Sequence, residues 1–251
     1  MPQTRARLRP IARDPPKRLT PARRPRAGAA VRPVARRSAV VGLGAATTAA
    51  LLAARRWSAR SRATAAERRA PLPGDELVPE PMWQATRAIT ISARREDVWP
   101  WLVQMGFPTQ RAGWYTPSWL DRIAFGIRAR SAETIIPRLQ DLAVGDRVPD
   151  SESGASFFTV ARLEPARALV LFSTTHPLPA YTDVRFSWAF ALHDAPGGTR
   201  LVIRARTACT PVWPGPVVRV LVVVGFGAGD VVQAGGMLLG IRRRAEAAAG
   251  A

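Results

Sequence analysis

The sequence is poor in the side chains that most often carry cross-links or reaction chemistry. Cys209 is its only cysteine, so no intramolecular disulfide can form. The two histidines, His176 before a proline and His193 at a predicted strand end, do not lie in a spacing typical of a metal site. No serine or cysteine stands in a motif that presents a nucleophile. We interpret both histidines as loop or strand-edge residues, and we expect no metal site.

Two further features are missing from the sequence. The glycine clusters at 42–46 and 225–229 do not open a strand–turn–helix unit of the length that a dinucleotide site needs, so no cofactor is expected. In the C-terminal part, the longest uncharged stretch, 220–229, has ten residues. A helix of that length is too short to cross a bilayer.

Negative charge is scarce in only one part of the chain. Residues 1–70 contain 18 Lys and Arg against 2 Asp and Glu, a net charge of +16, whereas residues 71–251 contain 19 against 16, a net charge of +3. A domain with so small a net charge has no strong field to attract phosphates. We therefore expect no specific nucleic-acid partner, and assign the basic surplus to the N-terminal part.

Residues 1–37 are rich in Arg, Pro and Ala and contain few large apolar side chains. Such a composition cannot bury enough surface to fold, so a disordered basic tail is predicted. The simplest interpretation is a solvated tail. A polybasic contact with a membrane surface or nucleic acid, or an upstream start codon, is the alternative.

A segment of 17 uncharged residues, 38–54, follows this tail between two pairs of arginines. It lies at the short edge of a membrane-spanning helix, which needs about 20 apolar residues. Arg36 and Arg37 before Ser38 also fit the loose start of a twin-arginine export signal. We predict a single-pass transmembrane or signal-anchor helix with the folded domain outside. The alternative is an Ala-rich helix of a cytoplasmic protein.

A linker is predicted over 55–81, because four prolines and a glycine between residues 71 and 81 break any helix. The folded domain is expected over 82–251. Its first strand is predicted at Thr86–Ala93, where apolar and polar residues alternate.

The hydrophobic period lengthens after this strand and predicts two short helices. The first begins near Glu96 and ends at the C-cap Gly106. The second has Thr116 as its N-cap and Pro117 at its first position, and runs to about Ala124. The apolar face of the first helix is formed by Val98, Trp101, Leu102 and Met105.

Alternating patterns predict most of the remaining chain as strands, after an unassigned stretch at 127–142. A turn at Gly145-Asp146 precedes a strand that opens at 147–149, and Ala195–Gly198 is the strongest hairpin signal. Four longer strands are predicted at 157–163, 168–173, 184–192 and 200–207.

Side chains distinguish the two faces of the last two strands. In the first of them, Phe186, Trp188, Phe190 and Leu192 share one face, which we assign to the side of the C-terminal helix. In the second, one face carries Arg200, Arg204 and Arg206 and is predicted to be wet.

Two helices are predicted at the C-terminal end. One covers 216–226, after which three glycines weaken the helix. Asp230 followed by Gln233 resembles a capping box, so a fresh helix is expected from about Asp230 to Ala248. Its apolar stripe is Val231, Ala234, Leu238 and Ile241.

Several short runs together resemble the SRPBCC superfamily of START-like, helix-grip proteins, and more narrowly an actinobacterial branch of it. They are TRAITI at 86–91, VWPWLVQMG at 98–106, RAGWY at 111–115, WLDR at 119–122, VGDRVP at 144–149, TRLVIRAR at 199–206 and MLLGIRRRAE at 237–246. The resemblance covers roughly 71–247. It implies an α+β fold, in which a curved antiparallel sheet wraps around a long C-terminal helix, with two short helices after the first strand and an apolar cavity inside. It implies no single activity and supplies no catalytic set.

The candidate ligand-binding residues lie around the first helix and the loop after it. Trp114 and Tyr115 are predicted to form the rim of the cavity, and Gln104 or Arg111 to give a polar anchor. Alternatively, the aromatic residues pack the helices onto the sheet and Arg111 pairs with Asp121. The rest of the candidate set is Phe186, Trp188, Phe190 and Met237.

The function that these observations favour is the binding of a hydrophobic small molecule, such as a lipid, polyketide or isoprenoid, by a membrane-tethered domain. The alternative is a cyclase or aromatase type of enzyme, in which the same cavity shapes a reactive chain and a few polar residues move protons. A third hypothesis is a structural protein whose pocket is closed by side chains. An open cavity of some hundreds of cubic ångströms separates the first two from the third.

Overall fold

A computed structural model of the chain describes residues 62–176, 181–211 and 216–250, all within one compact unit, Gly44–Ala251. The predicted basic tail and anchor helix, 1–37 and 38–54, lie outside the described residues. The helices are α2 (Ala65–Arg69), α3 (Arg95–Val103), α4 (Ser118–Phe125) and α5 (Pro216–Ala249), with 3₁₀ turns at Asp75–Leu77 and Pro137–Leu139. The strands are β1 (Trp83–Ile91), β2 (Arg147–Pro149), β3 (Phe157–Glu164), β4 (Ala168–Ser173), β5 (Tyr181–Ala195) and β6 (Gly198–Pro211).

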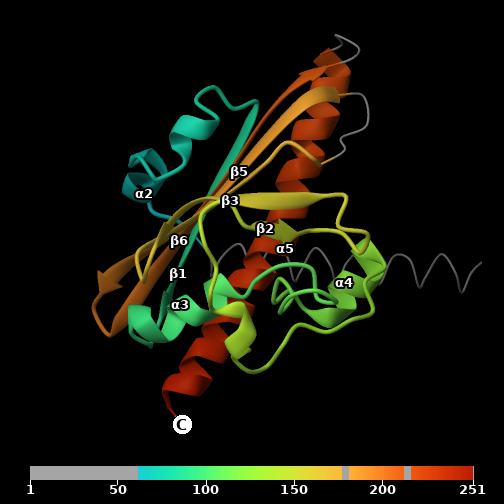
Figure 1. The fold of residues 1–251 in the computed structure, drawn as a ribbon. Coiled ribbons are helices and arrows are strands. Elements are labelled where there is room, and N and C mark those ends of the chain that lie inside the picture. The colour runs from blue at the N-terminus through green and yellow to red at the C-terminus, as the bar shows by residue number, and fades with distance from the viewer. Residues whose placement is uncertain (1–61, 177–180, 212–215, 251) are drawn as a thin grey trace, which may run out of the picture. The chain divides into compact units, whose positions relative to one another are not determined.

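The strands form one curved antiparallel sheet in the order β1-β6-β5-β4-β3-β2. The predicted hairpin is present, since Ala195 of β5 pairs with Gly198 of β6. Helix α5 crosses the inner face of this sheet, as Figure 1 shows in red. The α+β, helix-grip architecture expected from the sequence is therefore confirmed.

The core lies between the inner face of the sheet and α5. Phe186, Trp188 and Phe190 of β5 point into it, as the alternation predicted. They belong to the same apolar cluster as Met237 and other side chains of α5, which are almost completely buried. The α5 contribution that the structure describes is Ala234, Met237, Leu238, Ile241 and Ala245. Val231 of the predicted stripe lies outside the described side chains.

Helix α5 is continuous, so the prediction of two separate helices was wrong. Asp230 does not begin a new helix. Its carboxylate accepts a hydrogen bond from Nε of Arg87 on β1 at 2.6 Å, which ties the middle of α5 to the sheet edge. The helix continues through the glycines around position 227 despite their weak helix propensity. No helix in the described parts of the chain is both long and apolar enough to span a bilayer.

The start of α4 also differs from the prediction. The helix begins at Ser118 with Pro117 at the N-cap, and no side chain caps it. The hydroxyl of Thr116 instead donates a hydrogen bond to the carboxylate of Asp121, one turn into the helix. Both residues are buried, so this local pair replaces the cap that the sequence indicated.

The outer face of the sheet is covered, although its arginines predicted a wet face. Arg204 is only 3% exposed because residues 62–81, interpreted as linker, pack over it. Its guanidinium donates to Ala70 O, Asp75 Oδ2, Glu67 O, Arg68 O and Thr86 Oγ1. A small apolar cluster of Ala63, Leu72, Ala88, Ala191 and Val202 lies beneath the same segment. Part of the predicted linker therefore belongs to the folded domain.

Candidate functional site

A hollow with a volume of about 720 Å³ lies at the inner face of the sheet. Its walls come from the inner face of the sheet, from α5 and from the loops after α3, α4, β2 and β4. We call it the large hollow. Its lining residues are Phe107, Thr109, Trp114, Gly126, Ile127, Arg128, Ala129, Asp150, Ser151, Glu152, His176, Phe186 and Gln233. Its volume is within the range of small-molecule sites, about 300–1,000 Å³.

An aromatic wall forms the apolar side of the large hollow. Trp114 stacks on Trp188 with ring centroids 5.3 Å apart, and Trp188 stacks on Phe186 at 6.0 Å. Phe158 packs edge-on against Phe186 at 5.2 Å. Trp114 and Phe186 line the hollow, whereas Trp188 and Phe158 support them from behind. The alternating pattern of β5 predicted Phe186 and Trp188 on this face, and Trp114 was predicted separately at the cavity rim, whereas Phe158 of β3 was not singled out.

The indole N–H groups of this wall are unsatisfied. Nε1 of Trp114 and Nε1 of Trp188 are buried and find no hydrogen-bond partner among the described residues. A buried donor without an acceptor costs about 1–3 kcal/mol, so native proteins retain few of them. Trp114 lines the large hollow, but its Nε1 is itself buried, so an acceptor atom on a bound molecule would reach the N–H only after neighbouring side chains move.

His176 is a polar residue that lines the same hollow. Its Nε2 lies 2.8 Å from Oδ2 of Asp150, and its Nδ1 lies 2.7 Å from Oγ of Ser173. The ring packs 4.6 Å from the ring of Phe158, centroid to centroid. Ser173 Oγ also accepts from the backbone N–H of Thr175, and its own proton can point to Nδ1 of His176 or to Oγ1 of Thr175. This network favours the tautomer with the proton on Nε2, facing Asp150.

His176 was predicted to be a loop or strand-edge residue without a catalytic role, and no local pattern singled out Asp150. The structure places both on the wall of the large hollow, with side chains 19% and 24% exposed. Ser173, in contrast, is 3% exposed and belongs to β4, behind the histidine. A run of polar residues directly after a buried strand was the available signal, because chain segments leaving a sheet commonly carry site residues.

Gln104, predicted as a polar anchor, is completely buried and bonded within the protein. Its Nε2 donates to the hydroxyl of Tyr115 at 2.9 Å and to Thr134 O at 3.2 Å. Its Oε1 accepts from the backbone N–H of Ile136 at 2.8 Å. These contacts fasten the 134–136 loop to the end of α3.

Arg111, the other predicted anchor, ends helix α3. Its Nε donates to Met105 O at 2.6 Å and its Nη2 donates to Val103 O at 2.7 Å. These bonds satisfy carbonyl oxygens at the C-terminal end of α3 and just after it. It does not pair with Asp121, which is bonded to Thr116. Burial lowers the pKa of the Arg111 guanidinium.

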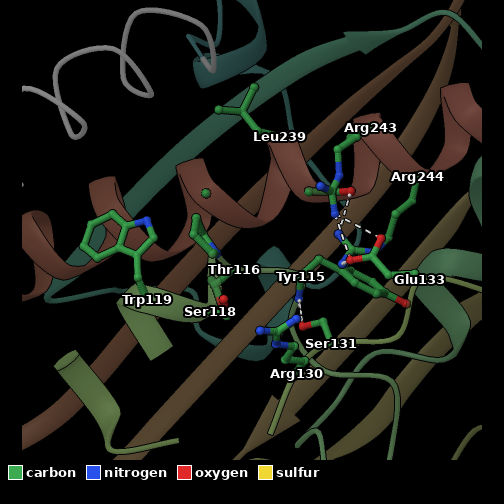
Figure 2. Close-up of a pocket in the computed structure, with 13 residues that line it drawn as sticks. Tyr115, Thr116, Ser118, Trp119, Arg130, Ser131, Glu133, Leu239, Arg243 and Arg244 are labelled. Carbon is green, nitrogen blue, oxygen red and sulfur yellow. Dashed lines mark hydrogen bonds and ion pairs between the residues drawn. The ribbon is translucent and has the colours of Figure 1, made fainter. Parts of the chain in front are cut away.

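Tyr115 belongs to a second hollow of about 450 Å³, between the start of α4 and α5 (Figure 2). Its backbone adopts a left-handed φ of 60°, and its carbonyl oxygen lies so close to α5 that a Cβ on Gly240 would be 2.0 Å from it. Its hydroxyl donates to Trp101 O at 3.0 Å, and burial raises the pKa of Tyr115. Tyr115 therefore holds α5 against the loop after α3.

Charged side chains dominate the second hollow. Arg243 and Arg244 both donate to the carboxylate of Glu133, at 2.9 and 2.7 Å, and Figure 2 shows these bonds as dashed lines. The Arg244 guanidinium also lies 4.8 Å over the ring of Tyr115. Arg130 and Trp119 line the same hollow. The lining of the second hollow is therefore less apolar than that of the large hollow.

The remaining candidates lie in the core. Phe190 and Met237 are fully buried in the cluster that contains Trp114 and Trp188. They shape the space behind the aromatic wall and do not line the large hollow. Among the described residues, no group of three or more His, Cys, Asp or Glu is placed to hold a metal ion.

No protein-family model matches this chain, and no curated protein matches it. Solved structures do resemble it. The di-domain ARO/CYC StfQ from the steffimycin biosynthetic pathway has a TM-score of 0.39 and 12% identity, over 67% of this chain and 52% of that one. Protein Ms6760 from Mycobacterium smegmatis has a TM-score of 0.38 and 13% identity, over 64% and 90%. Protein MLL2253 from Mesorhizobium loti has a TM-score of 0.33 and 17% identity, over 64% and 95%. At TM-scores below 0.5 these structures carry no information on the activity of this chain.

Proposed function

We propose that this protein binds an apolar small molecule with at least one oxygen acceptor, of the lipid, polyketide or isoprenoid class, in the large hollow. The observation that carries the proposal is a hollow of about 720 Å³ whose apolar wall is formed by Trp114 and Phe186. Phe186 and Trp114 supply apolar contact, and the indole N–H of Trp114, once neighbouring side chains move, selects an acceptor such as a carbonyl group. An apolar wall with few convergent polar groups is the usual composition of such sites.

The polar end of the ligand is assigned to His176 and Asp150. Their side chains lie 2.8 Å apart on the wall of the large hollow and remain partly exposed there. Gln104 and Arg111 keep supporting roles in this proposal, because their donors already bind Tyr115, Thr134 and the end of α3. We therefore assign the polar anchor for the ligand to Asp150 after β2 and His176 after β4, in place of Gln104 and Arg111.

The full chain, purified in detergent, tests the proposal by native mass spectrometry. We expect one unmodified apolar species to co-purify across preparations, and titrated 1,8-dihydroxyanthraquinone, a flat probe with carbonyl groups, to displace it. Phe186→Glu places a charge in the aromatic wall and should abolish both signals. Leu163→Glu, on β3 but absent from the hollow, is the matched control. Equal binding by the Phe186→Glu variant would contradict the proposal.

An enzymatic role of the cyclase type is the second candidate, and the His176–Asp150 pair favours it. A histidine paired with a carboxylate is a common arrangement for general acid–base catalysis. The pair would remove a proton from the carbon between two carbonyl groups of a poly-β-ketone chain, and the electron pair of the broken C–H bond would pass to one carbonyl oxygen. Positioned bases contribute about 10²–10⁴-fold to rate.

Turnover of a linear β-triketone mimic separates the enzyme from the binding protein. If the enzyme hypothesis holds, His176→Gln should lower the rate of cyclisation at least 100-fold while the affinity for the mimic changes less than threefold. His193→Gln, in the strand at the hairpin end, is the control and should leave the rate unchanged. Binding of the mimic without any cyclisation by the unaltered chain would rule out this hypothesis.

Tethering to a membrane through residues 38–54 remains part of the proposal. The support is the uncharged segment of 17 residues between two pairs of arginines. Cell fractionation of the full chain and of a chain without residues 1–56 tests it. Full-length protein that stays in the soluble fraction would contradict the anchor, whereas loss of membrane association after the deletion would support it.

A further inference from the structure

Helix α4 carries large apolar side chains on its outer side. Among the described residues, the large hydrophobic side chains that are exposed are Trp119 at 43%, Ile123 at 76% and Val144 at 63%. Trp119 and Ile123 are four positions apart on α4, so they lie on one face of the helix. Leu120 and Asp121 on the other side are buried. Single exposed hydrophobic residues are common, but a Trp and an Ile together on one short helix form a patch.

Arginines surround this pair. Arg122 lies between the two apolar residues on α4, Arg128 and Arg130 follow in the next loop, and all three are exposed. Figure 2 shows Arg130, Arg243 and Trp119 around the second hollow. The nearby carboxylates are already engaged, since Asp121 is bonded to Thr116 and Glu133 to Arg243 and Arg244.

We infer that this surface, Trp119, Arg122, Ile123, Arg128 and Arg130, docks onto an anionic lipid bilayer. Trp is the side chain that prefers the headgroup level, and Ile favours the adjoining acyl region. Arginines near the surface are attracted to anionic headgroups. The removal of one arginine should therefore weaken binding about fivefold. A nucleic acid would use the arginines but leave Ile123 exposed, so the combination of side chains favours lipid.

The surface lies beside the ligand site. Arg128 lines the large hollow, as do Gly126, Ile127 and Ala129 of the same loop. Docking would therefore bring one wall of that hollow to the bilayer. The inference concerns the surface only, and it stands whether or not the hollow binds a ligand.

A site-specific label tests the docking in the full chain, because the net charge of +16 on residues 1–70 would attract anionic vesicles by itself and hide a change in total binding. Cys209→Ser removes the native thiol, and Ile123→Cys provides a single site for an NBD fluorophore. We expect a blue shift and quenching by brominated acyl chains on vesicles of phosphatidylglycerol and phosphatidylcholine. On pure phosphatidylcholine the label should stay in water.

The matched control is Val144→Cys in the same background, since Val144 is the other strongly exposed apolar side chain. Its label should show neither change. A solvent-like signal at position 123 on bound protein, an equal signal at position 144, or a blue shift without vesicles, which indicates a protein contact, would each overturn the inference.

Charge variants refine the test. Changing Arg122, Arg128 and Arg130 together to Gln should remove most of the label's blue shift on vesicle-bound protein, because about fivefold for each arginine lowers the ratio of docked to undocked surface by roughly 100-fold. Changing Arg138, Arg167 and Arg185 to Gln alters the net charge equally at other exposed positions. If the two triple variants behave alike, general charge rather than this surface holds the label at the bilayer.

Discussion

The two faces of the sheet treat buried polar groups in opposite ways. On the outer face, Arg204 is buried with hydrogen bonds from all three guanidinium nitrogens to residues 67–75 and Thr86. On the inner face, the N–H groups of Trp114 and Trp188 have no acceptor in the described parts of the chain. Nε of Arg206 is an exception on the outer face.

We interpret this difference as one between a structural surface and the proposed binding surface. A guanidinium whose nitrogens all donate within the protein fixes the segment over it and has little capacity to bind another molecule. A buried donor without an acceptor is costly for stability, and a ligand that reached it after movement of the side chains would recover that cost. The four predictions below test this contrast, and begin with the largest effect.

Removal of the Arg204 side chain should be the most damaging change. Arg204→Ala leaves Asp75 and several backbone carbonyl groups without their donor, so the free energy of unfolding should fall by about 3–5 kcal/mol. Urea denaturation measures it. Arg185→Ala, an exposed arginine of β5, should change the stability by less than about 0.5 kcal/mol. Equal effects would mean that the outer network is not structural.

The inner face has its own ion pair at the sheet edge, Arg87 with Asp230, with side chains 12% and 9% exposed. Asp230→Asn leaves the Arg87 charge unpaired and should cost about 3 kcal/mol of unfolding free energy. The double variant Arg87→Met with Asp230→Leu should recover most of that loss, because no unpaired charge remains. If the double variant does not recover stability, the loss in Asp230→Asn does not come from an unpaired buried charge.

The ion pair of Glu67 with Arg200 makes the stability of the outer face depend on pH. The hydrogen bond from Arg200 lowers the pKa of the Glu67 carboxyl from 4.5 to about 2. The stabilisation is therefore complete above pH 4.5 and is lost as the pH falls from 4.5 toward 2. Glu67→Gln should lower the unfolding free energy by up to about 3 kcal/mol at pH 7 and by nearly nothing at pH 2. Urea denaturation at both pH values checks this, with the exposed Glu80→Gln as control.

The inner face should respond in ligand affinity more than in stability. Trp114→Phe removes the unsatisfied N–H and keeps an aromatic ring, so the affinity for 1,8-dihydroxyanthraquinone should fall about tenfold. Trp101→Phe removes a similarly unsatisfied N–H that does not line the large hollow, and should leave the affinity unchanged. Calorimetric titration compares the two variants. Equal losses would assign the effect to general repacking.

Local patterns predicted the elements that depend on neighbours in sequence. The strands, the hairpin at 195–198 and the aromatic face of β5 follow from alternation and turn residues. The same reasoning failed at Asp230, because its partner Arg87 is 143 positions away and no local rule contains that contact. The pair of His176 and Asp150 was missed for the same reason, since only the fold brings the ends of β2 and β4 together.

The chain's own order of residues determined the alternating strands, the aromatic inner face of β5 and the uneven distribution of charge. Only the tertiary structure decided which buried polar groups find partners. It closed the outer arginine face with residues 62–81, joined the C-terminal helices into α5, and left Trp114 with an unsatisfied donor. The physical reason is that hydrophobic period is a local property, whereas the pairing of a buried charge or N–H depends on segments distant in sequence.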